Sequence, residues 1–127
     1  MSNKNFPVIF DIKYHLIWHT KGREPVLTGG VKARLKEILE QDCKYMGISI
    51  LGGNIGISHV HMMLSCPPKL SASQIIQKLK GRSSRLLNQE FSSIKGGNPS
   101  DSFWEIAYFC HSFGEVSEEA LDDYIKS

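Results

Sequence analysis

At 127 residues, with 41% hydrophobic and 22% charged residues, the chain has the size and composition of one soluble domain with a single core. No apolar run approaches the roughly 20 residues of a membrane-spanning helix, and Asp11 and Lys13 interrupt the N-terminal apolar run, so we expect a cytoplasmic protein without a signal peptide or membrane contact. The net charge of +2 divides unevenly, because residues 1–100 hold 14 Lys and Arg against 6 Asp and Glu, whereas residues 101–127 hold 1 against 7. This basic body suits a polyanionic partner, although plain solvation of two surfaces explains the same division.

The first half of the chain changes from a period of two to a helical period. In residues 7–19 every second residue is apolar, and the residues between them are partly polar. This pattern predicts a half-buried strand whose second face carries Lys13 and His15. Gly and Pro mark residues 21–25 as a loop. Apolar residues then recur at helical spacing over residues 29–47, which predicts an amphipathic helix ending near a glycine.

The second half predicts two more strands, a helix and a fourth strand. Residues 48–57 form a strand with glycines at 52, 53 and 56 that suit a bulge or a close backbone approach. A third strand over 58–66, a helix over 71–91, a strand over 103–111 and a short helix capped by Ser117 follow. The order β-α-β-β-α-β predicts an α+β ferredoxin-like sandwich, an antiparallel sheet with two helices on one face and the other face open.

Cysteine usage excludes two kinds of site. Cys43, Cys66 and Cys110 are odd in number and widely spaced, so neither a disulfide framework nor a CxxC metal knuckle fits. A reducing compartment is the simplest interpretation.

Two of the five histidines lie one residue apart in the stretch ISHVHMMLS. Strand geometry puts His59 and His61 on the open face, where two imidazoles can converge on a divalent ion, but two ligands alone make a poor site. Solvated or hydrogen-bonded histidines remain the alternative. A histidine-triad nucleotide hydrolase needs a third histidine where this chain has Met63, so the sequence argues against this class of enzyme.

These pieces together resemble the single-tyrosine HUH transposases of small insertion sequences, which move DNA as single strands. His59-Val60-His61 fits the family's histidine–hydrophobic–histidine motif. Four longer stretches resemble its first strand, its HUH strand with the following helix, its last strand and its tyrosine helix: YHLIWHTKGREPVL, SHVHMMLSCPPKLSASQIIQKLKGRSSRLL, FWEIAYF and GEVSEEALDDYI. The resemblance covers nearly the whole chain, so residues 1–127 are expected to be a single HUH domain with a mobile C-terminal tyrosine helix at 113–127.

The resemblance implies a mechanism. Tyr124 would attack a backbone phosphate of single-stranded DNA, leaving a 5′-phosphotyrosine and a 3′-hydroxyl that allow later rejoining. His59 and His61 would hold Mg²⁺ or Mn²⁺, and no organic cofactor is expected. A homodimer is expected in which the tyrosine helix of one subunit can complete the site of the other. Without the resemblance, Tyr124 is a packing residue in an apolar stripe.

The match departs from the family at two places. The family's glutamine ligand, one helical turn after the tyrosine, would be residue 128, beyond the last residue given. A shortened chain, a truncated copy, or completion of the site by water, His111 or Asp123 would each explain this. Glu105-Ile106-Ala107 also stands where the family carries an arginine and a glycine, which puts DNA contacts there in doubt.

The expected DNA is single-stranded with hairpin ends, contacted largely through its backbone and shape. The candidate phosphate contacts are basic residues of the first loop and the second helix: Lys21, Arg23, Lys78, Lys80, Arg82 and Arg85. Two other functions stay open: a decayed or domesticated copy that binds hairpin DNA without cleaving it, and an RNA-binding sandwich, which the histidines argue against because that module stacks bases on paired aromatics.

Overall fold

The computed structural model describes residues 12–91 and 102–113. Tyr124, the predicted C-terminal helix and the start of the first predicted strand lie outside these residues. The described elements, in chain order, are β1 (Ile12–Thr20), the 3₁₀ turn η2 (Lys21–Arg23), α1 (Gly29–Met46), β2 (Ser49–Ile55), β3 (His59–Cys66), α2 (Ala72–Glu90) and β4 (Trp104–Phe113).

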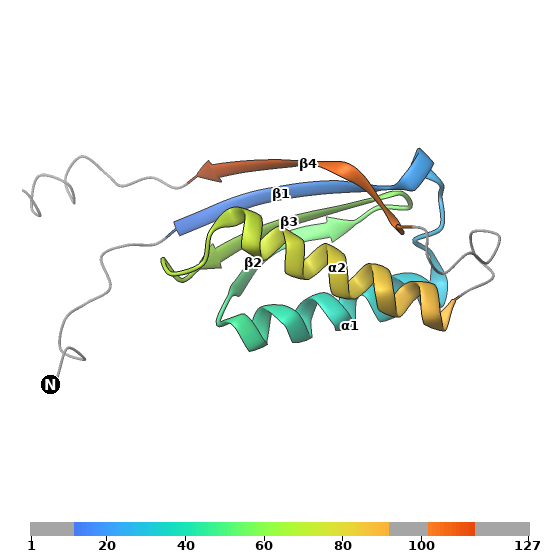
Figure 1. Ribbon diagram of the computed structural model, residues 1–127, viewed down its shortest axis with the longest axis horizontal. Coiled ribbons are helices and arrows are strands. Elements are labelled where there is room, and N and C mark those ends of the chain that lie inside the picture. The colour runs from blue at the N-terminus through green and yellow to red at the C-terminus, as the bar shows by residue number, and fades with distance from the viewer. Residues whose placement is uncertain (1–11, 92–101, 114–127) are drawn as a thin grey trace, which may run out of the picture.

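The four strands form one sheet in the order β2-β3-β1-β4, and each neighbouring pair is antiparallel. Both helices lie on the same side of this sheet, so the opposite side is open as far as the described residues go (Figure 1). The prediction of a ferredoxin-like α+β sandwich is therefore confirmed. The main shift in bounds is in β4, which continues to Phe113 rather than ending at 111.

The core lies between the sheet and the helices and follows the alternation of the strands. In β1, Leu16 and Trp18 are fully buried, and in β3, Val60 and Leu64 are fully buried. Because successive strand side chains point to opposite faces, their sequence neighbours are turned to the open face. The predicted facing of both strands is confirmed.

One end of each helix is set by local sequence chemistry. Ser71 forms a capping box with Gln74 at the start of α2, so two otherwise unpaired backbone N–H groups are satisfied. Gly47 ends α1 in the left-handed conformation at φ 73°, which glycine adopts without a Cβ penalty.

No described helix has the length and apolar character that crossing a membrane would require.

The glycines of β2 allow the strand to lie unusually close to β3. The register shifts between Ile50 and Gly52, as a bulge does. Gly53 has φ 132°, and a Cβ there would overlap the backbone carbonyl of His61. The predicted bulge and close approach are both confirmed. The close approach places the backbone of Gly53 directly against that of His61, one of the two motif histidines.

Candidate active site on the open face of the sheet

All five histidines of the chain project from the open face. His59 and His61 alternate with the buried residues of β3, and His15 and His19 alternate with those of β1. His111 of β4 pairs directly with His15, which places it on the same side of the sheet. The motif histidines are thus turned away from the helices, as the sequence predicts, and three further imidazoles share their surface.

The strand register divides four of these histidines into two cross-strand pairs. His19 lies directly opposite His59, with ring centroids 5.9 Å apart. The Nε2 atoms of His15 and His61 are in contact, and their ring centroids are 4.3 Å apart. Each motif histidine therefore has a histidine of β1 as its neighbour.

A glycine makes room for the His59 ring. Gly56 precedes β3 by a tight turn in which its N–H donates to the carbonyl of His59 at 2.8 Å. A Cβ at Gly56 would overlap the His59 imidazole. The small residue at this position therefore lets the ring lie across the turn.

The electrostatics of the face favour neutral imidazoles at His61 and His19. Burial lowers the pKa of His61, and the neighbouring His15 and His59 lower it further. Burial also lowers the pKa of His19, with Arg23 and His59 acting in the same direction and Glu105 opposing them. Because a histidine is neutral above its pKa, these shifts extend the pH range in which the rings have a lone pair for a metal.

The donor chemistry of this face suits a hydrated divalent ion. Two imidazoles of one strand and the facing His15 supply nitrogen donors. Within residues 12–91 and 102–113, however, no three His, Cys, Asp or Glu side chains are gathered into a ready metal site. An ion held here would keep water or take oxygen ligands from elsewhere, as Mg²⁺ commonly does.

The first basic loop borders the histidine face. Lys21 and Arg23 are exposed in η2, directly after His19 and Thr20 of β1. Arg23 has φ 53°, an uncommon left-handed conformation for a residue with a side chain. The carboxylate of Glu105 accepts the N–H of Gly22 at 2.7 Å, so β4 holds this turn beside His19.

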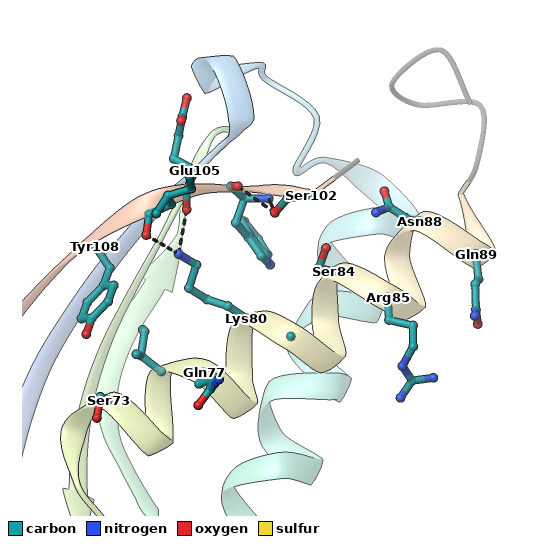
Figure 2. Close-up of a pocket in the computed structure, with 14 residues that line it drawn as sticks. Ser73, Gln77, Lys80, Ser84, Arg85, Asn88, Gln89, Ser102, Glu105 and Tyr108 are labelled. Atoms are coloured by element: carbon teal, nitrogen blue, oxygen red, sulfur yellow. Dashed lines mark hydrogen bonds between the residues drawn. The ribbon is translucent and has the colours of Figure 1, made fainter. Parts of the chain in front are cut away.

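Lys80 reaches from α2 to an irregular part of β4. Between the pairs Trp18–Tyr108 and Thr20–Trp104, three residues of β4 face a single residue of β1. The Lys80 ammonium donates to the carbonyls of Glu105 and Ile106 at 2.7 and 3.0 Å and lies 5.5 Å from the Tyr108 ring centroid (Figure 2). Burial lowers its pKa, against the opposing effect of Glu105. The structure thus gives this candidate phosphate contact a partner within the fold.

The other basic residues of α2 do not form one continuous patch. Arg82 turns toward α1, where it donates to Asp42 at 2.6 Å and to Gln41 at 3.3 Å. Lys78 is exposed beside it. Arg85 is exposed on the wall of a groove of about 720 Å³ between α2 and β4, which Lys80 also lines (Figure 2). Contact of all six predicted residues with DNA stays a prediction.

Sequence reasoning did not predict which residues lie next to the two motif histidines on the open face. His19 and His111 were visible on the polar positions of their strands, but their neighbours depend on the register. Glu105 was noted only as a departure, whereas it holds η2. Tyr124 and Asp123 lie outside the described residues, so their distance from the histidine face stays open.

The described residues thus form an α+β sandwich whose open sheet surface is rich in histidine. Comparison with known proteins narrows this description. The family model described as "Transposase IS200 like" matches residues 8–127. The chain belongs to this family of DNA-processing enzymes, the single-tyrosine transposases of small insertion sequences.

Individual relatives agree with the family assignment. The chain is 31% identical over 117 residues to the transposase of insertion sequence IS200 from Salmonella typhimurium, covering 92% of this chain and 76% of that protein. It is 30% identical over 123 residues to the ISDra2 transposase TnpA of Deinococcus radiodurans, covering 94% and 85%.

Two solved structures share the fold. A Deinococcus radiodurans R1 structure described as a transposase superposes with a TM-score of 0.75 at 26% identity, covering 99% of this chain and 96% of that one. A REP-associated tyrosine transposase bound to a REP hairpin superposes with a TM-score of 0.65 at 13% identity, covering 99% and 67%.

Proposed function

We propose that this IS200-like transposase cleaves and rejoins single-stranded DNA at insertion-sequence ends through a 5′-phosphotyrosine intermediate. The observation that carries the proposal is the placement of His59 and His61 on the open face of the sheet, in a chain that belongs to this family. Imidazoles packed among the helices would have had no access to DNA.

The chemistry proposed for Tyr124 is a transfer of a phosphodiester bond. Its phenolic oxygen forms a bond to phosphorus, the bond from phosphorus to the 3′-oxygen breaks, and the departing 3′-oxygen ends as a hydroxyl. The phenol proton passes to water and the departing 3′-oxygen takes up a proton from water, so no net proton is gained or lost. Because the phosphotyrosine retains the bond energy, a 3′-hydroxyl can later attack it and rejoin strands without a nucleotide cofactor.

The histidine face is the proposed place of a divalent metal, Mg²⁺ or Mn²⁺, with His59 and His61 as protein ligands. Such an ion, when bound, polarises a phosphate and stabilises the charge that develops on its oxygens. The lowered pKa of His61 supports this proposal, because it keeps that imidazole neutral over a wider pH range. Lys21 and Arg23 border the same face and are suited to hold the DNA backbone there.

The partners proposed for the chain are hairpin-bearing single-stranded DNA and a second copy of itself. One structural neighbour is bound to a REP hairpin, which supports hairpin DNA as the ligand class here. A homodimer would let the segment bearing Tyr124 in one subunit serve the histidine face of the other.

The test is formation of a covalent adduct. Full-length protein is mixed with a single-stranded oligonucleotide carrying an element end and its hairpin, with Mg²⁺ or Mn²⁺, and adducts are resolved on a denaturing gel. Tyr124→Phe should abolish the adduct and keep hairpin binding, whereas Tyr45→Phe, at a tyrosine that is 87% exposed on α1, should react like the wild type. Cleavage by Tyr124→Phe at the wild-type rate would refute the assignment.

A second function, hairpin binding without cleavage, has a specific observation in its favour. No three-residue metal cluster is present within residues 12–91 and 102–113. If wild-type protein binds hairpins but forms no adduct with either metal, this alternative replaces the first.

A further inference from the structure

We propose that the open face of β4 is a stacking platform for unpaired bases of single-stranded DNA, made by Phe109, His111 and Phe113. The inference rests on the proposed function, because it takes single-stranded DNA as the ligand. It adds a base-binding surface that lies outside the histidine motif and outside the basic residues already named. It starts from the side chain of Phe109, which is 53% exposed although it is large and apolar.

The strand register places Phe109 in one row with a motif histidine. Ile17 of β1 lies directly opposite Phe109 on one side and directly opposite His61 on the other. Residues that lie directly opposite each other point to the same face of a sheet, so all three side chains are on the open face. Because neighbouring strands are about 4.8 Å apart, Phe109 lies roughly 10 Å from His61 across the sheet. A short stretch of unpaired DNA can therefore contact both residues.

Two further rings extend this surface along β4. The His111 ring lies nearly parallel to the Phe109 ring, with an interplanar angle of 26° and a centroid distance of 6.3 Å. Phe113 follows on the same face, and its ring centroid is 5.6 Å from that of His15. Residues two apart along a strand share one face, so these rings form a continuous strip. Phenylalanine and histidine rings are surfaces on which proteins stack unpaired bases.

The charges of the open face suit a polyanion. No Asp or Glu occupies an open-face position of β1 or β3, or of β4 between Phe109 and Phe113. Lys13 lies directly opposite Phe113, and Lys21 and Arg23 follow the other end of β1. Cationic side chains at both ends can hold phosphates while the rings hold bases. The same mixture argues against a second copy of the chain as the occupant, because the centre of a protein–protein interface is depleted of lysine.

The test is binding of a fluorescein-labelled oligothymidine of about 12 nucleotides, a length within the usual site sizes of single-strand binding folds, to full-length protein in EDTA. Fluorescence anisotropy gives the affinity. Phe109→Leu removes the ring, keeps an apolar side chain and should weaken binding about tenfold, the scale of losing one base–aromatic stack. Phe109→Trp keeps a ring and should stay within about threefold of the wild type.

Ile106→Ala is the matched control. Ile106 is 92% exposed on the same strand, but it lines the groove beside α2 instead of the open face. Its affinity should also stay within about threefold of the wild type. Binding by Phe109→Leu at the wild-type affinity would overturn the proposal, and so would an equal loss in Ile106→Ala. Should Phe109→Leu not fold, Phe109→Trp decides the matter: quenching of its added fluorescence by oligothymidine supports stacking, and unchanged emission contradicts it.

Further measurements separate the possible failures. Light scattering should give the same mass for the wild type and Phe109→Leu, and a lower mass for the variant would assign Phe109 to a subunit contact and overturn the proposal. Tighter binding of oligouridine than of oligothymidine would assign the platform to RNA and also overturn it. Binding in EDTA needs neither Tyr124 nor a metal, so it can succeed where the adduct assay fails. Wild-type protein that forms the adduct, together with unweakened binding by Phe109→Leu, would refute this inference alone.

Discussion

At the scale of single residues, basic side chains of the same helix have different tasks. Asp42 is buried on α1, and its Oδ1 accepts from Arg82 while its Oδ2 has no partner among the described residues. Arg82 therefore neutralises a carboxylate that water scarcely reaches. Arg85, one turn further along α2, is exposed and forms no ion pair within residues 12–91 and 102–113.

Arg82→Met should lower the free energy of unfolding by about 1–2 kcal/mol, because it leaves the buried Asp42 carboxylate unpaired while Arg82 itself is partly solvated. Urea denaturation measures the change. The control Arg85→Met should stay within about 0.5 kcal/mol of the wild type. Equal effects of the two substitutions would show that the ion pair contributes nothing.

Hairpin DNA binding should depend on the exposed basic residues of α2, which matter little for the free energy of unfolding. Lys78→Ala and Arg85→Ala should each weaken hairpin binding and reduce the slope of log K against log salt by about 1, as the loss of one phosphate contact does. Fluorescence anisotropy at several salt concentrations measures this. Lys44→Ala, at the exposed end of α1, is the control. An unchanged slope for both variants would remove α2 from the DNA-binding surface.

At the scale of elements, an irregular segment of β4 holds the loop that borders the histidine face. The bulge in β4 exposes carbonyls that accept hydrogen bonds from Lys80, and the carboxylate of Glu105, within the bulge, accepts the N–H of Gly22 in η2. Sequence alternation predicted the facing of β1 and β3, because each of these strands has one buried face. β2 and β4 were also predicted, although β2 has no buried residue and β4 has only Trp104 buried. Alternation did not predict the bulge in β4, since that irregularity is stabilised by an ammonium from a different element, 25 residues away along the chain.

Two glycines of these elements should respond oppositely to alanine. Gly81→Ala should stabilise the protein by about 0.5–1 kcal/mol, because α2 gains helix propensity and a Cβ there meets nothing within 4 Å. Gly53→Ala should destabilise it, since the new Cβ overlaps the backbone of β3. Thermal and urea unfolding measure both. A destabilising Gly81→Ala would mean that the groove beside α2 is filled in solution.

At the scale of the whole molecule, a single core holds the sheet against the two helices, and the histidine face depends on its strand order. The sequence predicted which face His59 and His61 would occupy, because a period of two fixes sides. It did not predict that His61 meets His15 and that His59 meets His19, because those neighbours follow from the register between β1 and β3. The role of Tyr124 came from family resemblance alone and stays a prediction.

Cysteine reactivity should report the opening of this core. Cys43 is 1% exposed, and burial raises the pKa of its thiol to about 12, whereas Cys110 is only partly buried. At pH 8, Cys110 should therefore be alkylated first, with Cys43 and Cys66 modified only as the molecule unfolds. Mass spectrometry over a time course with iodoacetamide checks this. Early modification of Cys43 would contradict a close-packed helix–sheet interface.

The central claim is that the histidine-bearing open face of the sheet is where DNA is cut. The most direct measurement is the yield of the covalent protein–DNA adduct for His59→Ala and His61→Ala, with Mn²⁺, at protein concentrations that saturate the hairpin. We predict that both variants bind the hairpin and form no adduct above background, while Lys44→Ala forms it like the wild type. Adduct formation by both histidine variants at the wild-type rate would contradict the account.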